Sequence, residues 1–577
     1  MADRTSSAGQ GWDAIVVGAG LGGLTVAACL AIRALRVLVL EQHTVAGGNS
    51  QVFRRLGAYE FDVGTHYIGD CGPSGALPAI YRGLGLEGRI TFREIDPDGF
   101  DRIVLPSVDV RVPRGWRAYR ERMAQALPAE AEAVRTYVDR CAAIYATASQ
   151  AQGASPGGQL SAADGSGTGL RTATVTLGAL MRKCGLSARA RTVLAAQIGN
   201  LGVAPDQVSV LSYVGMLGDY LEGAYYPEGG GQMLAATLVE ALQAHGGELR
   251  TRSLVTEILT ERGRVAGIRL ADSTVLRAPV VISNADYRRT VLELLGSEQL
   301  PAAVAARAQR SVMAFPLVTL YLAIDEAAPS PPAANLWWYE SEDVDALFHE
   351  LMAGMLDAPR FAFISSGSAK DPRPRPTRAR GAGRGRLLTA HHTVEVMTLC
   401  PVTGAWAVDE DARGYGYRAD PCYDSRKRQA GAALLAVAER ALGPLRDHIL
   451  HSEVAMPETQ VRFACSTGGT AYGLASTPRQ FGPLRPDHQT PLPGLFLAGA
   501  STRSGMGIRG VIIGGVHCAE AVLGESILAE MYAGKVLGDP ALLAPRPPGW
   551  DPLLASRGTR PGRGTLRVTA GAARRSG

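Results

Sequence analysis

Three glycines near the start of the chain follow the pattern G-x-G-x-x-G. They are Gly18, Gly20 and Gly23, and they come directly after an apolar run at residues 14–17. Between a strand and a helix, such glycines permit a tight turn, a close approach of the backbone to a pyrophosphate, and close packing of the helix on the strand. The start of the helix then offers free N–H groups to the phosphates. The pattern therefore predicts a dinucleotide-binding site.

An acidic residue and a second glycine turn extend this predicted site. Glu41 ends the next apolar run, residues 36–40, where a carboxylate can accept hydrogen bonds from ribose hydroxyls. Strand, helix and parallel strand in this order predict a βαβ unit with a buried parallel sheet. The apolar stretch 14–32 is therefore expected to be a buried strand, turn and helix rather than a membrane span. The small residues at 47–49 let the backbone run along an extended dinucleotide.

The C-terminal part supplies a third piece. A strand at 495–498 runs into Gly499, and a glycine-rich turn precedes a helix at 511–523, whose N-terminus would face the far end of the cofactor. Together with the turn at 47–49, this favours FAD over NAD. A second G-x-G-x-x-G match at 505–510 has no acid-tipped strand after it, so we expect no second nucleotide site. The predicted FAD contacts are Gly18, Ala19, Gly20, Gly22, Gly23, Glu41, Gly47, Gly48, Asn49, Gly499, Ala500, Gly507, Ile508 and Val511.

The sequence resembles the FAD-dependent family of phytoene desaturases, carotenoid isomerases and retinol saturases. Within it, the segment F-D-V-G-T-H-Y-I-G at 61–69 is most similar to the retinol saturase branch, because the carotene desaturases carry Pro-Thr where this chain has Thr65 and His66. The chain departs from the family pattern at Ala34, where glycine is common, and at Ser504 and Arg509, where proline is common. The matching stretches are 13–20 with Glu41, 61–69, 226–230, 281–286, 395–398, 469–473 and 495–510.

The resemblance implies an α/β fold: a Rossmann-like FAD-binding domain of the glutathione reductase and amine oxidase type, with an inserted α+β substrate domain. A helix at 232–244 and strands at 248–259, 265–270 and 280–283 fit this plan. Val255 is then expected at the adenine end, by analogy with the same strand in related flavoproteins. The predicted organisation is a leader at 1–10, an FAD domain from 11–70, 225–300 and 455–535, and a substrate domain from 71–224 and 301–454. Flexible loops are expected at 149–169 and 371–386, and a disordered basic tail at 544–577.

The chemistry implied by the resemblance is redox chemistry, or isomerisation, at a carbon–carbon bond of a lipophilic polyene or isoprenoid-like substrate. Flavin can accept a hydride from C–H or donate one to C=C. In the reductive direction a side chain must also deliver a proton. His66, Tyr67 and Tyr472 are the candidates for this role. Saturation, desaturation and isomerisation all remain open, as does the electron donor or acceptor.

Two rival functions share the first βαβ unit. An amine-oxidase-like flavoenzyme is one, but its usual cysteine or aromatic signatures near the flavin are not evident. A non-catalytic lipid carrier related to the Rab GDP-dissociation inhibitors is the other, and the complete glycine and glutamate set argues against it. His391 and His392 are adjacent, so in a strand they point to opposite faces, and no metal site is predicted.

Composition and charge indicate which partners and which cellular compartment to expect. The net charge of +5 is concentrated in 370–386 and 544–577, and aromatic residues are 6% of the chain. A nucleic-acid surface would need a basic stripe with interleaved aromatics, so no nucleic-acid partner is expected. Eight scattered cysteines without a C-x-x-C pair favour a reducing compartment, and no secretory signal is visible. We expect a cytoplasmic protein, and the resemblance implies peripheral contact with a bilayer.

Overall fold

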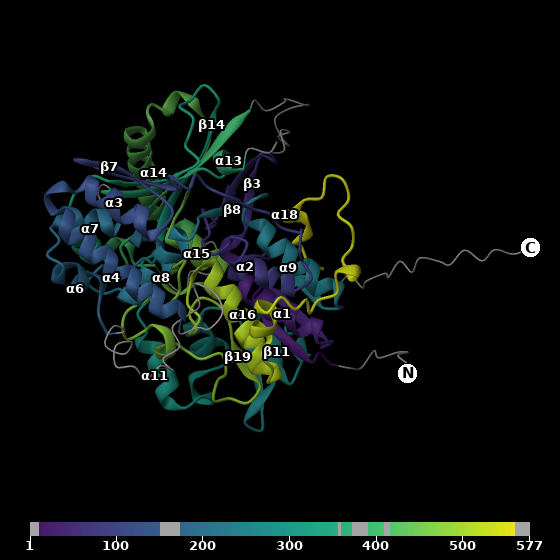
Figure 1. Ribbon diagram of the computed structural model, residues 1–577. Coiled ribbons are helices and arrows are strands. Elements are labelled where there is room, and N and C mark those ends of the chain that lie inside the picture. Colours follow the sequence, from purple (N-terminus) through teal and green to yellow (C-terminus); the bar gives the residue numbers. More distant parts are fainter. Residues whose placement is uncertain (1–10, 151–173, 356–358, 372–389, 409–415, 560–577) are drawn as a thin grey trace, which may run out of the picture.

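A parallel sheet carries the N-terminal glycine turn. The computed structural model describes residues 11–150, 174–355, 359–371, 390–408 and 416–559 (Figure 1). Its five-stranded sheet has the order β19-β13-β1-β2-β9, with every neighbouring pair parallel. The strands are β1 (Ala14–Val17), β2 (Val37–Glu41), β9 (Glu248–Thr251), β13 (Val280–Ser283) and β19 (Leu495–Leu497). Segments far apart in the sequence thus meet in one sheet.

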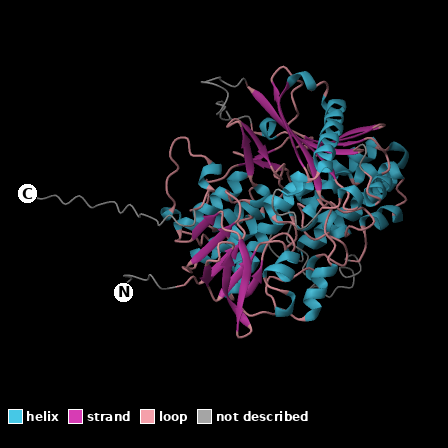
Figure 2. Ribbon diagram, turned by 180° about the vertical axis from the view of Figure 1, so that it is seen from behind, coloured by secondary structure: helices cyan, strands magenta, loops and turns pink. Residues whose placement is uncertain are grey.

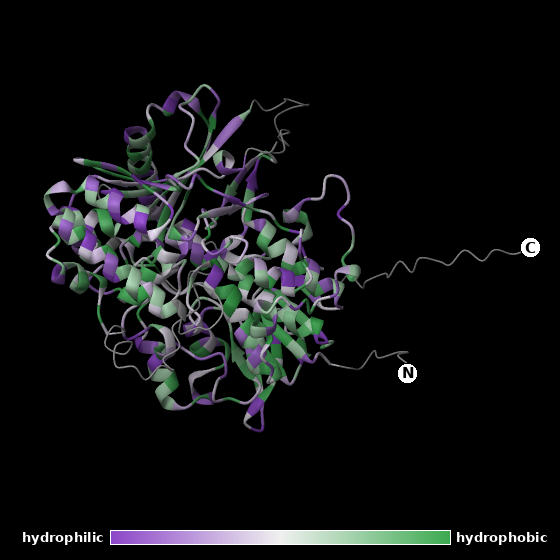
Figure 3. Cartoon of the chain, in the orientation of Figure 1, coloured by the Kyte–Doolittle hydropathy of each residue, from purple (hydrophilic) through white to green (hydrophobic). Residues whose placement is uncertain are grey.

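Three helices pack around this sheet. They are α1 (Leu21–Ile32), α9 (Gln232–Ala244) and α16 (Gly507–Leu523), and α1 contacts both of the others. All four residues of β1 and nearly all of α1 are buried, which is why this stretch reads as continuously apolar. Figure 3 shows the hydrophobic colouring gathered around α1 and α16. Residues 14–32 are therefore a buried strand, turn and helix, as expected.

A seven-stranded sheet forms the second layer, seen apart from the first in Figure 2. Its order is β18-β14-β17-β16-β15-β6-β7, and all pairs are antiparallel except β15 with β6. The strands are β6 (Asp101–Leu105), β7 (Val108–Val112), β14 (Leu317–Asp325), β15 (Asn335–Tyr339), β16 (Phe361–Ser365), β17 (His391–Leu399) and β18 (Ile449–Ala455). Buried Trp337, Phe361 and Phe363 on one face join the core of the helical layer.

Helices cover both faces of the second sheet. The helices α3 (Trp116–Ala126), α4 (Ala131–Gln150), α6 (Leu177–Lys183), α7 (Ala188–Leu194) and α8 (Val210–Leu221) share one apolar core with it, and α14 (Pro421–Leu442) packs on the opposite side. Helix α8 has the sequence VLSYVGMLGDYL, with Val210, Tyr213, Val214 and Leu217 buried at helical spacing. This places its remaining face against the space between the two sheets.

Smaller elements connect the layers. These are β3 (Val52–Arg55), β4 (Tyr59–Asp62), α2 (Ala76–Gly83), β5 (Phe92–Glu94), β8 (Tyr225–Pro227), β10 (Val255–Glu261), β11 (Arg264–Leu270), β12 (Val275–Arg277), α11 (Ala302–Arg310), α12 (Val344–Met352), α13 (Gly367–Lys370), α15 (Pro457–Ala464), α17 (Ile527–Tyr532) and α18 (Pro552–Ala555). None of the helices in the described ranges is long and apolar enough to cross a membrane.

Two sequence expectations need correction. The single strand expected at 248–259 is broken into β9 and β10, because Arg252 adopts a left-handed backbone with φ +58°. The disordered basic tail expected at 544–577 is wrong for its described part, 544–559: Arg546 pairs with Glu240 at 2.8 Å, and the Thr559 N–H donates to the Leu249 carbonyl. Residues 544–559 are therefore packed on the parallel-sheet half.

Other expected flexible segments lie outside the described residues. These are the leader at 1–10, nearly all of the loop at 149–169 and of the loop at 371–386, and the end of the chain at 560–577. The described start of the first loop is helical, since α4 ends at Gln150. At the other loop, Asp371 accepts a hydrogen bond from the Gly229 N–H.

Candidate functional site

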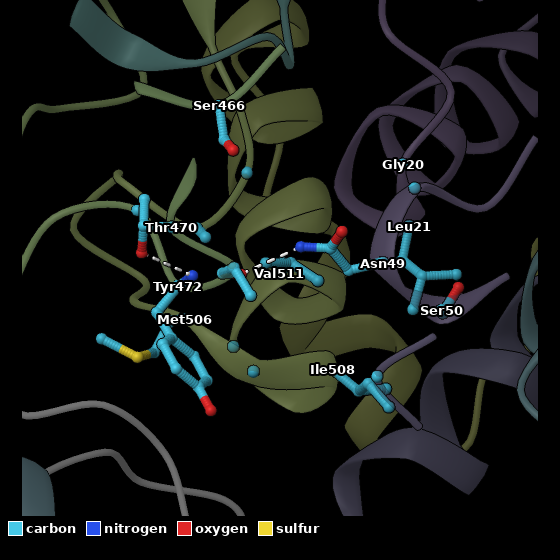
Figure 4. A pocket seen from close by; sticks show the side chains of 18 of the residues that line it. Gly20, Leu21, Asn49, Ser50, Ser466, Thr470, Tyr472, Met506, Ile508 and Val511 are labelled. Atoms are coloured by element: carbon cyan, nitrogen blue, oxygen red, sulfur yellow. Dashed lines mark hydrogen bonds between the residues drawn. The ribbon is translucent and has the colours of Figure 1, made fainter. Parts of the chain in front are cut away.

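One cavity joins the two sheets. Its volume is about 570 Å³, within the range of small-molecule sites. The glycine turn after β1, the turn at 47–50 and the start of α16 line one part of it, and α8 and the seven-stranded sheet line another. Figure 4 shows residues of the first part around the same space: Gly20 and Leu21, Asn49 and Ser50, and Met506, Ile508 and Val511. A ligand bound along the parallel sheet would therefore reach the second layer.

The glycines of the first turn leave room that no other residue would leave. Gly18 has φ +95°, and a Cβ on Gly23 would lie 2.3 Å from the Gly18 carbonyl oxygen. A Cβ on Gly20 would lie 2.8 Å from the Asn284 amide nitrogen. A Cβ on Gly48 would lie 3.2 Å from the Gly20 Cα. Gly23 therefore permits helix packing, while Gly20 and Gly48 keep an open cradle for a ligand.

Glu41 stands at the end of β2, beside this cradle. Its two carboxylate oxygens accept hydrogen bonds from the Ala19 N–H at 2.9 Å and the His43 N–H at 2.8 Å. Burial raises the pKa of the Glu41 carboxyl, and the backbone N–H groups oppose that shift. Each oxygen keeps a further lone pair, so a carboxylate held in this way can still accept from ribose hydroxyls.

Unpartnered polar atoms around the cradle fit a polar cofactor. The Asn284 Oδ1 and Ser466 Oγ atoms are buried without a hydrogen-bond partner among the described residues, and both side chains line the cavity. Such atoms cost about 1–3 kcal/mol each when left unsatisfied. Asn49 donates to the Ala471 carbonyl at 3.0 Å, which ties the second glycine turn to the 470–473 loop (Figure 4). The residues present therefore fit a dinucleotide cofactor.

Most of the predicted cofactor residues line this cavity. Two do not: Ala19 uses its backbone N–H for Glu41 and its carbonyl for the Gly47 N–H, and Gly23 packs α1 on β1. The residues that do line it are Gly18, Gly20, Gly22, Glu41, Gly47, Gly48, Asn49, Val255, Gly499, Ala500, Gly507, Ile508 and Val511.

The three predicted proton donors also line the cavity, but each is held in a state that disfavours proton transfer. Burial, with a contribution from nearby Lys370, lowers the pKa of His66 to about 3, so the imidazole is neutral at pH 7. Burial and the neighbouring Asp101 raise the pKa of Tyr67 well above 10. Burial likewise raises the pKa of Tyr472, whose hydroxyl donates to the Gly199 carbonyl at 2.9 Å.

Tyr67 is better described as part of the cavity wall. Its ring stacks on Tyr220 with centroids 4.0 Å apart, and its hydroxyl donates to Asp101 at 3.2 Å. The same hydroxyl accepts from the Asn200 amide at 2.8 Å. Both hydrogen-bonding capacities of the phenol are therefore engaged by the protein.

The second layer contributes an apolar wall. The resemblance implied an apolar channel in the substrate domain, but the sequence did not indicate which residues line it. Residues from α8 and from β14, β15, β16 and β17 form it; they include Leu211, Met216, Leu317, Trp337, Phe361, Phe363 and Met397. Alternating apolar residues in the strands were the available signal, but the pairing of these strands is long-range. The wall suits a long apolar substrate and excludes water.

A buried lysine holds the first layer to the second. The Lys370 ammonium donates to the His66 carbonyl at 2.7 Å, Ser365 Oγ at 2.6 Å and Asn335 Oδ1 at 2.5 Å. Burial lowers the pKa of Lys370 to about 8, against the raising effect of Glu395, Asp62 and Asp101. Through the His66 carbonyl, Lys370 fixes the segment that carries the predicted donors.

Fold and cavity together define a class: a Rossmann-type dinucleotide-binding oxidoreductase with a second, substrate-side layer. Residues 16–84 match the NAD(P)-binding Rossmann-like domain. Solved structures of the same fold include an oxidoreductase from Methanosarcina mazei, with 18% identity, TM-score 0.58 and 89% of this chain and 100% of that chain covered. A putrescine oxidase bound to putrescine has 14% identity and TM-score 0.58, with 89% and 99% covered. These structures show the fold.

Two curated proteins of similar sequence indicate which oxidoreductases this chain resembles. The chain is 26% identical over 551 residues to all-trans-retinol 13,14-reductase of Macaca fascicularis, covering 90% of this chain and 87% of that protein. It is 27% identical over 531 residues to the chloroplastic prolycopene isomerase of Arabidopsis thaliana, covering 89% and 83%. Over about nine tenths of its length the chain is thus similar to retinol reductases and prolycopene isomerases, in agreement with the resemblance that its motifs indicated.

Proposed function

We propose that this protein is an FAD-dependent oxidoreductase that acts on a carbon–carbon bond of a lipophilic polyene or isoprenoid-like substrate. The observation that carries the proposal is the shared cavity: a glycine cradle with a carboxylate at one part and an apolar aromatic wall at another. Relatives named for retinol reduction and for prolycopene isomerisation support a polyene substrate.

The extent of the cavity supports FAD as the dinucleotide, rather than a nicotinamide nucleotide. The cavity extends from Glu41 and Val255 to the start of α16, so an extended dinucleotide could lie along it with its redox ring near the aromatic wall. Bound flavin would supply hydride transfer at the substrate. The chain's own residues would bind its phosphates, orient the polyene against Trp337 and Phe363, and exclude water.

The relatives point to two directions of reaction. Those named all-trans-retinol 13,14-reductase favour saturation of a double bond, and those named prolycopene isomerase favour a redox-neutral isomerisation. Amine oxidation is less favoured, because the amine oxidases share this fold at 14–17% identity. A lipid carrier without flavin would have no need of the open glycine cradle.

The experiment is the visible spectrum of the purified protein, before and after anaerobic addition of NAD(P)H, with Gly20→Val as the matched variant. We expect a flavin spectrum in the wild-type protein and none in the variant, because the new side chain fills the cradle. Bleaching by NAD(P)H would indicate a nicotinamide-fed reductase, and an unchanged flavin would indicate another electron partner or an isomerase. A folded wild-type protein that takes up no FAD would contradict the proposal.

For location, we propose the cytoplasm with peripheral contact to a bilayer, from which a lipophilic substrate would arrive. The basic segments at 370–386 and 560–577 would meet anionic lipids. Co-sedimentation with anionic vesicles, reduced at high salt, is the expected result. Equal recovery with neutral vesicles would contradict the electrostatic part.

A further inference from the structure

Two charged residues line the cavity, where a purely apolar surface would be expected, and a third stands behind them; we call these three residues the charged trio. It consists of Arg509 on α16, Asp70 after β4, and Asp219 on α8. The Arg509 Nε atom lies 2.6 Å from Asp70 Oδ2 and 3.7 Å from Asp219 Oδ2.

The two carboxylates of the trio have different surroundings. Asp70 makes the short contact with Arg509, and its Oδ1 accepts from the Ala76 N–H at the start of α2 at 3.1 Å. Asp219 has no such backbone donor in the described structure, and it accepts from the Tyr145 hydroxyl at 3.3 Å. The charged form of Asp70 is therefore stabilised more strongly, and a proton shared by the pair resides on Asp219.

The carboxylates also differ in their access to the cavity. Asp219 lines it, together with Arg509 and Tyr145, whereas Asp70 does not. The side chain of Asp219 is 17% exposed, against 6% for Asp70. The proton-bearing carboxyl thus faces the substrate space, and the ionised carboxylate stands behind it.

We propose that Asp219 is the proton donor of the reaction and that Asp70 and Arg509 are positioning residues. Asp70 keeps the Asp219 carboxyl protonated, and Arg509 holds the two carboxyl groups in place. The proposal rests on the proposed function and adds a residue to it. In the reductive direction, reduced flavin, when bound, would supply a hydride to one carbon of a substrate C=C bond and would thereby be the reductant. Asp219 would give its proton to the other carbon as the π bond is lost, and the resulting carboxylate would take its next proton from water.

The electrostatics of the trio agree with this role. Burial raises the pKa of Asp219 to about 7, with Arg509 lowering it and Asp70 raising it further. Glu222 on the same helix adds to the rise, and the Tyr145 hydroxyl opposes it. Cys71 and Tyr220 also face Asp219 and are neutral at pH 7, because burial raises the pKa of both.

Two variants should shift the pKa of the Asp219 carboxyl in opposite directions. Asp70→Asn removes the competing carboxylate, so the activity of FAD-loaded, reduced protein should begin to fall at lower pH than in the wild type. Tyr145→Phe removes a donor to the charged form, so the fall should begin at higher pH. Asp219→Asn should lower the rate by about 10²–10⁴-fold and abolish the fall. Asp206→Asn, an exposed carboxylate paired with Arg182, is the control.

A melting experiment tests the same carboxyl without flavin or polyene. A raised pKa means that the folded state binds a proton which the unfolded state releases, so the contribution of this carboxyl to wild-type stability falls as the pH rises from about 4 to about 7. The melting temperature of Asp219→Asn relative to wild type should therefore rise over this range. The proposal would be overturned if the difference in melting temperature between Asp219→Asn and wild type did not change with pH. It would also be overturned if activity began to fall at the same pH in Asp70→Asn and in Tyr145→Phe. If Asp219→Asn does not fold, the Tyr145→Phe shift decides, since it leaves all charges in place.

Discussion

The parallel-sheet half and the seven-stranded half of this molecule build their parts of the cavity by different means. The first uses backbone and absent side chains: Gly18, Gly20 and Gly48 leave space, and N–H groups hold Glu41. The second uses large side chains brought together from distant segments, such as Trp337 and Phe363, and Lys370 behind this wall bonds the His66 carbonyl. A site built from local backbone geometry can therefore be predicted from the sequence, whereas a site built by long-range packing cannot.

The largest loss of stability is expected from a substitution in the seven-stranded half, at Lys370. Lys370→Met removes the cation that bonds His66, Asn335 and Ser365, and leaves buried carboxylates without it. Breaking a buried charged network costs about 3–5 kcal/mol of unfolding free energy. The urea midpoint should fall accordingly, while Lys535→Met, whose lysine is exposed, should change it little. Equal urea midpoints for the two variants would show that the buried Lys370 contacts do not stabilise the seven-stranded half.

The next largest effect is expected from two glycine-to-alanine substitutions, one in each half of the molecule. Gly23→Ala places a Cβ 2.3 Å from the Gly18 oxygen, and overpacking of this kind costs about 1–3 kcal/mol. Gly215→Ala on α8 meets no atom within 4 Å, and alanine should stabilise that helix by about 0.5–1 kcal/mol. We expect opposite changes in melting temperature. The same sign for both would show that the first glycine turn is not specially constrained.

The smallest effect is expected at Ala34, between α1 and β2. Its backbone is left-handed, with φ +62°, a conformation that costs a non-glycine residue about 1–2 kcal/mol. Ala34→Gly should therefore raise the free energy of unfolding by somewhat under that amount, measured by urea denaturation. Flavin content should not change, because Ala34 lies away from the cavity lining. A loss of stability would show that the alanine side chain contributes packing that outweighs the strain.

Sequence reasoning located the parallel sheet well and the substrate side poorly. The helix 232–244 and the strand 280–283 were predicted with the bounds of α9 and β13. The helix shows an apolar face at helical spacing and a glycine stop, and the strand is a short continuous apolar run. The break at Arg252 was not predictable, since arginine gives no turn signal. Arg509 was noted as a departure, but its partners Asp70 and Asp219 lie far from it in sequence. The interpretation of His66, Tyr67 and Tyr472 as donors remains a prediction, although their surroundings disfavour it.

The most direct test of the account is product analysis with FAD-loaded protein, reduced anaerobically with dithionite and offered all-trans-retinol, prolycopene or putrescine. The account predicts that a polyene is converted, either to a product with two more hydrogens or to an isomer of unchanged mass, and that Asp219→Asn slows the conversion. Putrescine oxidation by the oxidised protein, with both polyenes unchanged at full flavin occupancy, would contradict it.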